Sequence, residues 1–352
     1  MIRAAARIGF FTRLDLAARH VGVIGLVFLA GCGSDGRDTA LLVGTSLPDE
    51  LRERVERSFE AENPSIDVRF VEAGDGVAAL VNRDSASAFD VWWAAPATVL
   101  HRAAEAGLLQ PHRPAWVTES GGDAEHVTDL WHPVLLTPFV IAFNREVVPI
   151  ARAPRDWRDI FHLRWLEEVY ALDPTRSADG AYFIGAMAMD ALRRDGDVEP
   201  AFDWLVRLER QIGRWVGEPG DAIRALGADN AKLAILPRAV VEAARSRDAS
   251  WLHYRAPTTG TPQLTLGIAI MRGTTVDEAA RRFVDHVGTT EVVTESKLLT
   301  HWDPAHGAVA ETRLPSGFEI EQRATVYPLA LDTLVTEIDG WVSRWDLQIR
   351  GR

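Results

Sequence analysis

The chain contains a single cysteine, Cys32, among its 352 residues. A lone thiol excludes an internal disulfide, so the folded state must be stabilised by packing. Long apolar runs are lacking as well. The run at residues 21–30 is too short to span a bilayer, which needs about 20 apolar residues. A net charge of -12 argues against nucleic acid as a partner.

Motifs of common enzymes are also absent from the sequence. It has no Gly-x-Ser-x-Gly elbow, no Gly-x-x-x-x-Gly-Lys-Ser/Thr loop and no His-Glu-x-x-His. These patterns carry nucleophilic, phosphate-binding and zinc chemistry respectively. We therefore predict a protein that is not an enzyme and that needs no cofactor.

The amino-terminal stretch has the features of an export signal. Four arginines precede the apolar residues 21–30, and small residues follow, which together describe a secretory signal peptide over residues 1–31. Leu29-Ala30-Gly31-Cys32 resembles the lipobox of bacterial lipoproteins, in which the cysteine is lipidated. The resemblance implies a membrane anchor on Cys32, an extracytoplasmic location (periplasm or cell surface) and a polar tether over residues 32–39.

Alternating strand and helix patterns follow from residue 40. Residues 39–44 and 89–93 are expected to be buried strands, and residues 66–71 alternate as a strand does. Leu51, Val55 and Phe59 recur at helical spacing, and further helices are expected at 76–83 and 97–106. This order predicts an α/β domain with a mostly parallel sheet. The length of about 310 residues after the tether predicts two domains.

Several short motifs of this region resemble family-1 extracellular solute-binding proteins, the group with ferric-ion, polyamine and phosphonate binders. In the first half they are Phe59-Glu60 with Ile66 and Val68, Asp90-Val91, and Glu105-Ala106-Gly107-Leu108-Leu109. In the second half they are Pro154 to Ile160, read as a helix, Asp173-Pro174-Thr175-Arg176-Ser177-Ala178-Asp179-Gly180, and Val276 to Asp285. The resemblance covers most of residues 40–347.

The resemblance implies a two-lobed type II periplasmic-binding-protein fold with two crossing strands, at residues 133–144 and 264–271. The first lobe would comprise residues 40–137 plus 268–352, whose C-terminal helices can pack on both lobes. The second lobe would comprise 138–267, with a hinge near Thr137-Pro138. The implied function is capture of a small solute in an interlobe cleft and its delivery to an ABC permease and ATPase by a monomer. A sensory or partner-binding lipoprotein without transport is the alternative.

The ligand should lie beyond the carboxyl ends of the strands, where helix N-termini present free N–H groups. Four loops of the sequence meet this condition. Their candidate ligand-binding residues are Thr45, Ser46, Ala95, Thr175, Ser177, Gly180 and Arg238.

Arg238 favours an anionic solute, because a guanidinium matches phosphonate, phosphate ester or carboxylate groups. It stands where the ferric-ion binders carry a pair of tyrosines, and this chain has only four tyrosines, none adjacent. Ferric iron or a polyamine remains the alternative ligand, and a cation would use Asp173, Asp179 or Asp229.

Two histidine pairs are possible metal sites in the sequence. His301, Asp303 and His306 lie close in sequence, and His126 and His132 form a looser pair. Pro304 interrupts helical spacing and no further cluster completes four ligands. We therefore predict no metal site.

Overall fold

The computed structural model describes residues 39–73, 89–118, 129–306 and 324–351. Residues Gly36–Arg352 group into one compact unit, apart from Met1–Asp35. Cys32, the tether before Thr39, the helix expected at 76–83 and His126 lie outside the described residues. Among the described residues, no helix is long and apolar enough to cross a membrane.

One mixed sheet runs through the described part of the chain, in the order β2-β1-β3-β10-β5-β8-β6-β7. The main strands are β1 (Thr39–Thr45), β2 (Ile66–Glu72), β3 (Val91–Pro96), β5 (His132–Asn144), β6 (Val169–Leu172), β7 (Ile212–Val216), β8 (Leu233–Pro237) and β10 (Gln263–Met271). The short strands β4 (Leu109–Gln110), β9 (Leu252–Arg255) and β11 (Asp303–Pro304) pair at its sides.

Helices cover the faces of this sheet. They are α1 (Asp49–Glu62), α3 (Ala97–Glu105), α4 (Ala115–Thr118), α5 (Ala178–Asp195), α6 (Glu199–Glu209), α7 (Pro219–Gly227), α8 (Arg238–Arg247), α9 (Asp277–Val287), α10 (Thr290–Thr300) and α11 (Leu331–Gln348). Three 3₁₀ turns, η2 (Ile150–Arg152), η3 (Trp157–Phe161) and η4 (Leu163–Trp165), lie between β5 and β6. The helix expected at 154–160 is therefore wrong in type. The capping box of Asp156 and Asp159 starts this 3₁₀ turn, and the chain is extended again at His162.

The first lobe contains β1 to β4. β1 pairs in parallel with β2 and β3, as the sequence pattern predicts. Leu51, Val55 and Phe59 of α1 are fully buried and belong to one hydrophobic cluster with residues of β1, β2 and β3. The helical spacing of these three residues therefore places one apolar face of α1 on the sheet.

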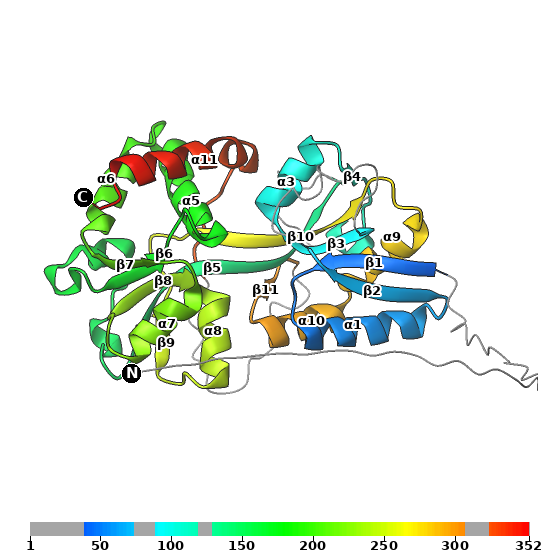
Figure 1. The fold of residues 1–352 in the computed structure, drawn as a ribbon, viewed down its shortest axis with the longest axis horizontal. Coiled ribbons are helices and arrows are strands. Elements are labelled where there is room, and N and C mark those ends of the chain that lie inside the picture. The colour runs from blue at the N-terminus through cyan, green and yellow to red at the C-terminus, as the bar shows by residue number, and fades with distance from the viewer. Residues whose placement is uncertain (1–38, 74–88, 119–128, 307–323, 352) are drawn as a thin grey trace, which may run out of the picture. The chain divides into compact units, whose positions relative to one another are not determined.

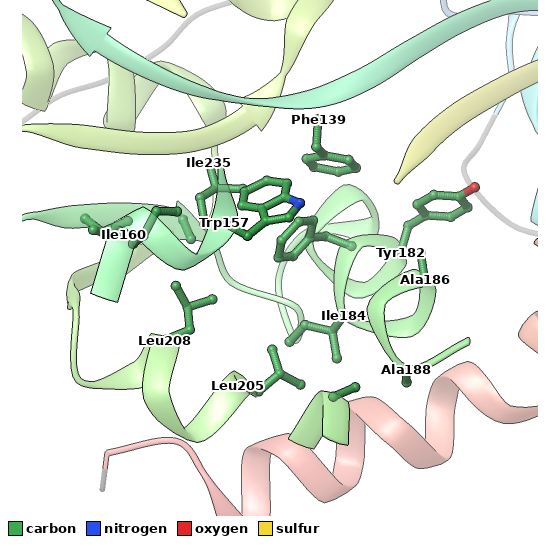
Figure 2. Packing of buried hydrophobic residues seen from close by; sticks show 14 of the residues in the cluster. Phe139, Trp157, Ile160, Tyr182, Ile184, Ala186, Ala188, Leu205, Leu208 and Ile235 are labelled. Atoms are coloured by element: carbon green, nitrogen blue, oxygen red, sulfur yellow. The ribbon is translucent and has the colours of Figure 1, made fainter. Parts of the chain in front are cut away.

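The second lobe contains β6 to β9, and β6 pairs in parallel with both β7 and β8. Its core gathers Phe139 of β5, Trp157 of η3 and Ile184 of α5. Figure 2 shows Ile184 beside Leu205 of α6, with Phe139 above Trp157. The aromatic rings of Trp157 and Phe183 meet edge to face with centroids 5.6 Å apart.

Two long strands, β5 and β10, run between the lobes (Figure 1). They pair with each other antiparallel over β5 residues 132–138. From Phe139 onward β5 pairs instead with β8 of the second lobe. The change of partner follows Pro138, which has no N–H to offer a ladder.

The C-terminal helix α11 packs into the second-lobe core through Leu334, Ile338, Trp341 and Trp345. It also contacts α3 of the first lobe. Arg102 donates to the carbonyl of Val335 at 3.1 Å, and a first-lobe imidazole, His101, lies 2.9 Å from Asp332. Helix α11 therefore touches elements of both lobes.

Candidate functional site

The predicted ligand loops lie at the carboxyl ends of two pairs of parallel strands. In the second lobe β6 and β8 are parallel neighbours, so their ends at Leu172 and Pro237 share one edge of the sheet. Helices α5 and α8 begin directly beyond that edge. In the first lobe β1 and β3 are parallel neighbours as well. This is the arrangement in which open α/β sheets bind ligands.

The loop after β6 is held by the buried carboxylate of Asp173, whose side chain is 1% exposed. Its Oδ1 atom accepts hydrogen bonds from the backbone N–H and the hydroxyl of Thr175, at 2.9 and 2.7 Å. Arg350, just beyond α11, donates to the other carboxylate oxygen at 2.6 Å and to the Thr175 hydroxyl at 3.2 Å. Arg350 therefore holds the loop that follows β6 in place.

Ser177 caps helix α5 by accepting a hydrogen bond from the N–H of Gly180 at 3.3 Å. Gly180 is buried because the helix lies directly on β6. A Cβ atom there would come within 2.6 Å of the Leu172 carbonyl oxygen. Only glycine allows the helix start to approach the strand this closely.

We therefore expect Gly180→Ala to lower the free energy of unfolding by about 1–3 kcal/mol, since backbone atoms cannot yield as a side chain can. Gly340→Ala is the matched control, because Gly340 lies exposed in α11 and a Cβ would meet nothing within 4 Å. That change should stabilise the helix by roughly 0.5–1 kcal/mol. Chemical denaturation measures both, and a neutral Gly180→Ala variant would contradict the close packing.

Arg238 is the first residue of α8, and Pro237 precedes it as the N-cap. Its guanidinium is half-buried and forms an ion pair with Asp303 of β11. The hydroxyl of buried Thr137 accepts the N–H of the next residue, Ala239, at 3.0 Å. The guanidinium of Arg238 therefore already has an anionic partner. A solute anion would have to share this guanidinium with Asp303 or displace Asp303 from it.

In the first lobe, Thr45 is fully buried and its hydroxyl accepts the N–H of Leu47 at 3.2 Å. Ser46 is exposed, and its hydroxyl lies 3.4 Å from the Ala73 carbonyl. The loop expected at Ala95 is wrong, because β3 continues to Pro96 and Ala95 pairs there with Gly267 of β10. Ala95 is 1% exposed, and Ala94 before it has a φ of 60°, which is rare for a residue other than glycine. The seven candidate ligand-binding residues remain predictions as solute contacts.

The structure does not bring His301, Asp303 and His306 together as metal ligands. The ring of His301 contacts the hydroxyl of Ser246 at 3.1 Å, and Asp303 pairs with Arg238. The His306 ring packs on Trp116, with centroids 4.6 Å apart. Burial lowers the pKa of both histidines. No group of three or more histidine, cysteine or acidic side chains within the described ranges could hold a metal ion.

Asp303 and Arg350 are the neighbours of the site that sequence reasoning missed. The sequence pattern around Asp303 suggests only a metal ligand, and nothing in the sequence near Arg350 marks it as part of a site. Arg350 lies 177 residues from Asp173 in sequence. No local motif signals such a pairing.

The elements described so far form a two-lobed α/β fold (Figure 1). Similar solved structures include the periplasmic binding protein AfuA from Actinobacillus pleuropneumoniae, with fructose-6-phosphate bound. It is 18% identical, with a TM-score of 0.71 over 89% of this chain and 99% of that one. Iron-bound HitA from Pseudomonas aeruginosa is 17% identical, with a TM-score of 0.72 over 87% and 98%. The predicted type II fold is confirmed.

A family model described as "Bacterial extracellular solute-binding protein" matches residues 41–294. The chain belongs to this family, and the resemblance drawn from the sequence motifs is confirmed at this level. A curated relative, the probable ABC transporter periplasmic-binding protein y4fP of Sinorhizobium fredii, is 23% identical over 249 residues. The match covers 69% of this chain and 68% of the relative.

Proposed function

We propose that this protein is an extracytoplasmic receptor, anchored through lipidated Cys32, that captures a small anionic solute between its lobes. It would then deliver the solute to the permease and ATPase of an ABC importer, and would catalyse no reaction. Membership of the solute-binding family supports capture. The name of the Sinorhizobium relative supports an importer as the partner. The apolar run followed by Leu-Ala-Gly-Cys supports the anchor.

The observation that favours an anion is the convergence of a guanidinium with helix N-termini at one sheet edge. Parallel β6 and β8 bring the start of α5, capped by Ser177, to the same edge as Arg238 at the start of α8. Helix N-termini and arginine both stabilise negative charge. The fold alone does not determine the ligand. Proteins with this fold include one with bound fructose-6-phosphate and one with bound iron.

The solute class can be tested by thermal shift of the full mature chain against phosphonates, phosphate esters, carboxylates, polyamines and Fe(III). A solute at 100 times its dissociation constant stabilises the protein by about 2.7 kcal/mol. We expect an anion to raise the melting temperature. A shift with only Fe(III) or polyamines would refute the anion and leave the receptor. No shift with any compound would count against solute capture itself.

Arg238→Ala should weaken anion binding about 10–100-fold, the usual range for losing a charged hydrogen bond. Asp303→Asn should have the opposite effect, because Asp303 competes with the solute for the same guanidinium. Isothermal titration calorimetry measures both. Arg247→Ala is the control on the same helix, since Arg247 is exposed and, within the described part of the chain, its side chain donates to the Ala243 carbonyl alone. Weaker anion binding by Asp303→Asn would show that Arg238 does not contact the solute.

A further inference from the structure

A second basic feature lies on the other side of the second lobe. A hollow of about 640 Å³ is lined by five arginines, namely Arg152, Arg155, Arg158, Arg164 and Arg207. The first four belong to the segment that leads into the amino end of β6, and Arg207 lies on α6. The proposed solute loops follow the carboxyl ends of β6 and β8. The arginine hollow is therefore a separate site.

The neighbouring acids offset only part of the positive charge of the hollow. Among the described residues, Asp159 is the one acid that lines it. Its carboxylate accepts the N–H groups of Arg155 and Asp156 at 2.9 and 3.1 Å. The carboxylate of Asp156 behind it is buried and accepts from Thr258 and Thr259. Asp156 also pairs with Arg158 at 3.9 Å. Two carboxylates therefore lie beside five guanidinium groups, so the hollow keeps a net positive charge.

Two of the five guanidinium groups are held in place by aromatic rings. Arg207 lies 4.1 Å above the ring centroid of Phe161. Arg164 lies 4.4 Å from the ring of Trp165 and donates to the Arg152 carbonyl at 2.9 Å. Stacking of this kind orders the planar forks before any ligand arrives, which lowers the entropy cost of binding. The hollow is prepared for anionic groups.

Exposed apolar side chains adjoin the same arginines. Leu163 is 81% exposed, Leu166 is 48% exposed and Ile150 is 40% exposed. Leu163 lies next to Arg164 in η4, and Ile150 begins η2, which ends at Arg152. A surface that combines protruding leucines with arginines matches a membrane interface, where phosphates lie above acyl chains.

We propose that this surface rests on anionic lipid headgroups, with the arginines on lipid phosphates and Leu163 inserted between them. The proposal rests on the membrane anchor of the proposed function. A tether over residues 32–39 would keep the folded part near the bilayer at high effective concentration, so weak lipid contacts suffice. The chain as a whole carries a net charge of -12. A local basic surface would therefore orient the protein with this face toward an anionic membrane.

Flotation with protein-free vesicles tests the proposal, using residues 36–352 without the lipid. This part is one compact unit that contains the four described hydrophobic clusters. We expect binding to vesicles of equal parts phosphatidylglycerol and phosphatidylcholine, loss of binding in high salt, and none to pure phosphatidylcholine. Replacing Arg152, Arg155 and Arg158 by Gln should weaken binding by about 100-fold. Leu163→Ser should weaken it too.

The control changes the same charge elsewhere, with Arg214, Arg247 and Arg282 replaced by Gln, all of which are exposed. It should retain most of the vesicle binding. Equal binding to both kinds of vesicle, or none to either, would overturn the proposal and would favour a protein partner. Competition by inorganic phosphate, with no effect of Leu163→Ser, would identify a small-anion site instead. Solute binding measured in parallel by calorimetry is independent of these outcomes.

Discussion

Asp173→Ala is expected to lower the free energy of unfolding by about 3 kcal/mol, because it removes the buried acceptor of three hydrogen bonds. Two come from Thr175 and one from Arg350. For a chain of this size the melting temperature should fall by roughly 4–6 °C. Solute affinity should fall as well, since the carboxylate orders the loop before α5. Calorimetric unfolding and titration measure the two effects.

Asp346→Ala is the matched control for this prediction. Asp346 binds the same Arg350 at 2.9 Å, but its side chain is 41% exposed, and exposed ion pairs contribute only about 0–1 kcal/mol. Arg350→Ala tests the other half of the buried ion pair. A double-mutant cycle that combines it with Asp173→Ala should give a coupling energy between the two side chains of about 0.5–3 kcal/mol. Equal effects of Asp173→Ala and Asp346→Ala would show that the loop is not held by its buried carboxylate.

Much of this fold could be predicted from local patterns, because burial and periodicity act within single elements. The strand expected at 39–44 is β1, and the crossing strands expected at 133–144 and 264–271 are β5 and β10. The apolar spacing of Leu51, Val55 and Phe59 identified α1. The error at η3 has a local cause, since an Asp156 cap and Trp157 suit the first turn of either helix type.

The candidate site could be predicted only in part. Strand ends and small hydroxyl residues point to the loops, and family motifs point to Arg238. Asp303 and Arg350, however, reach their partners over 65 and 177 residues, and such contacts depend on how whole elements pack. The sequence also cannot show that the hydroxyl of Thr175 is already engaged by Asp173. From the neighbouring residues alone, the Thr175 hydroxyl looks equally able to bind a solute.

Asp179 provides the second large effect, and it depends on pH. It lies half-buried in the first turn of α5, and burial raises the pKa of its carboxyl group to about 6. In the unfolded chain the pKa is about 3.9. The folded state therefore binds the proton more tightly. The carboxyl contributes stability at low pH, and this contribution is lost as the pH rises from about 4 through 6.

Asp179→Asn should consequently make the protein more stable than the wild type above about pH 6, by roughly 1–3 kcal/mol, and about equal to it below pH 4. Urea denaturation across this range measures the difference. Asp277→Asn is the control with the opposite sign. Hydrogen bonding to Arg281 lowers the pKa of Asp277 in the first turn of α9, so its loss should destabilise at neutral pH. A pH-independent difference for Asp179→Asn would show that its carboxyl is well solvated.

The same carboxyl reports on the charge of the solute. Asp179 lies in the first turn of α5, beside the Ser177 cap. An anion bound at that helix start would be repelled by the ionised form. It should therefore bind more tightly to the wild type below about pH 6, and Asp179→Asn should remove this dependence. A cation would show the reverse, with weaker binding in acid. Titration of the wild type and variant at both pH values therefore separates an anion receptor from an iron or polyamine receptor.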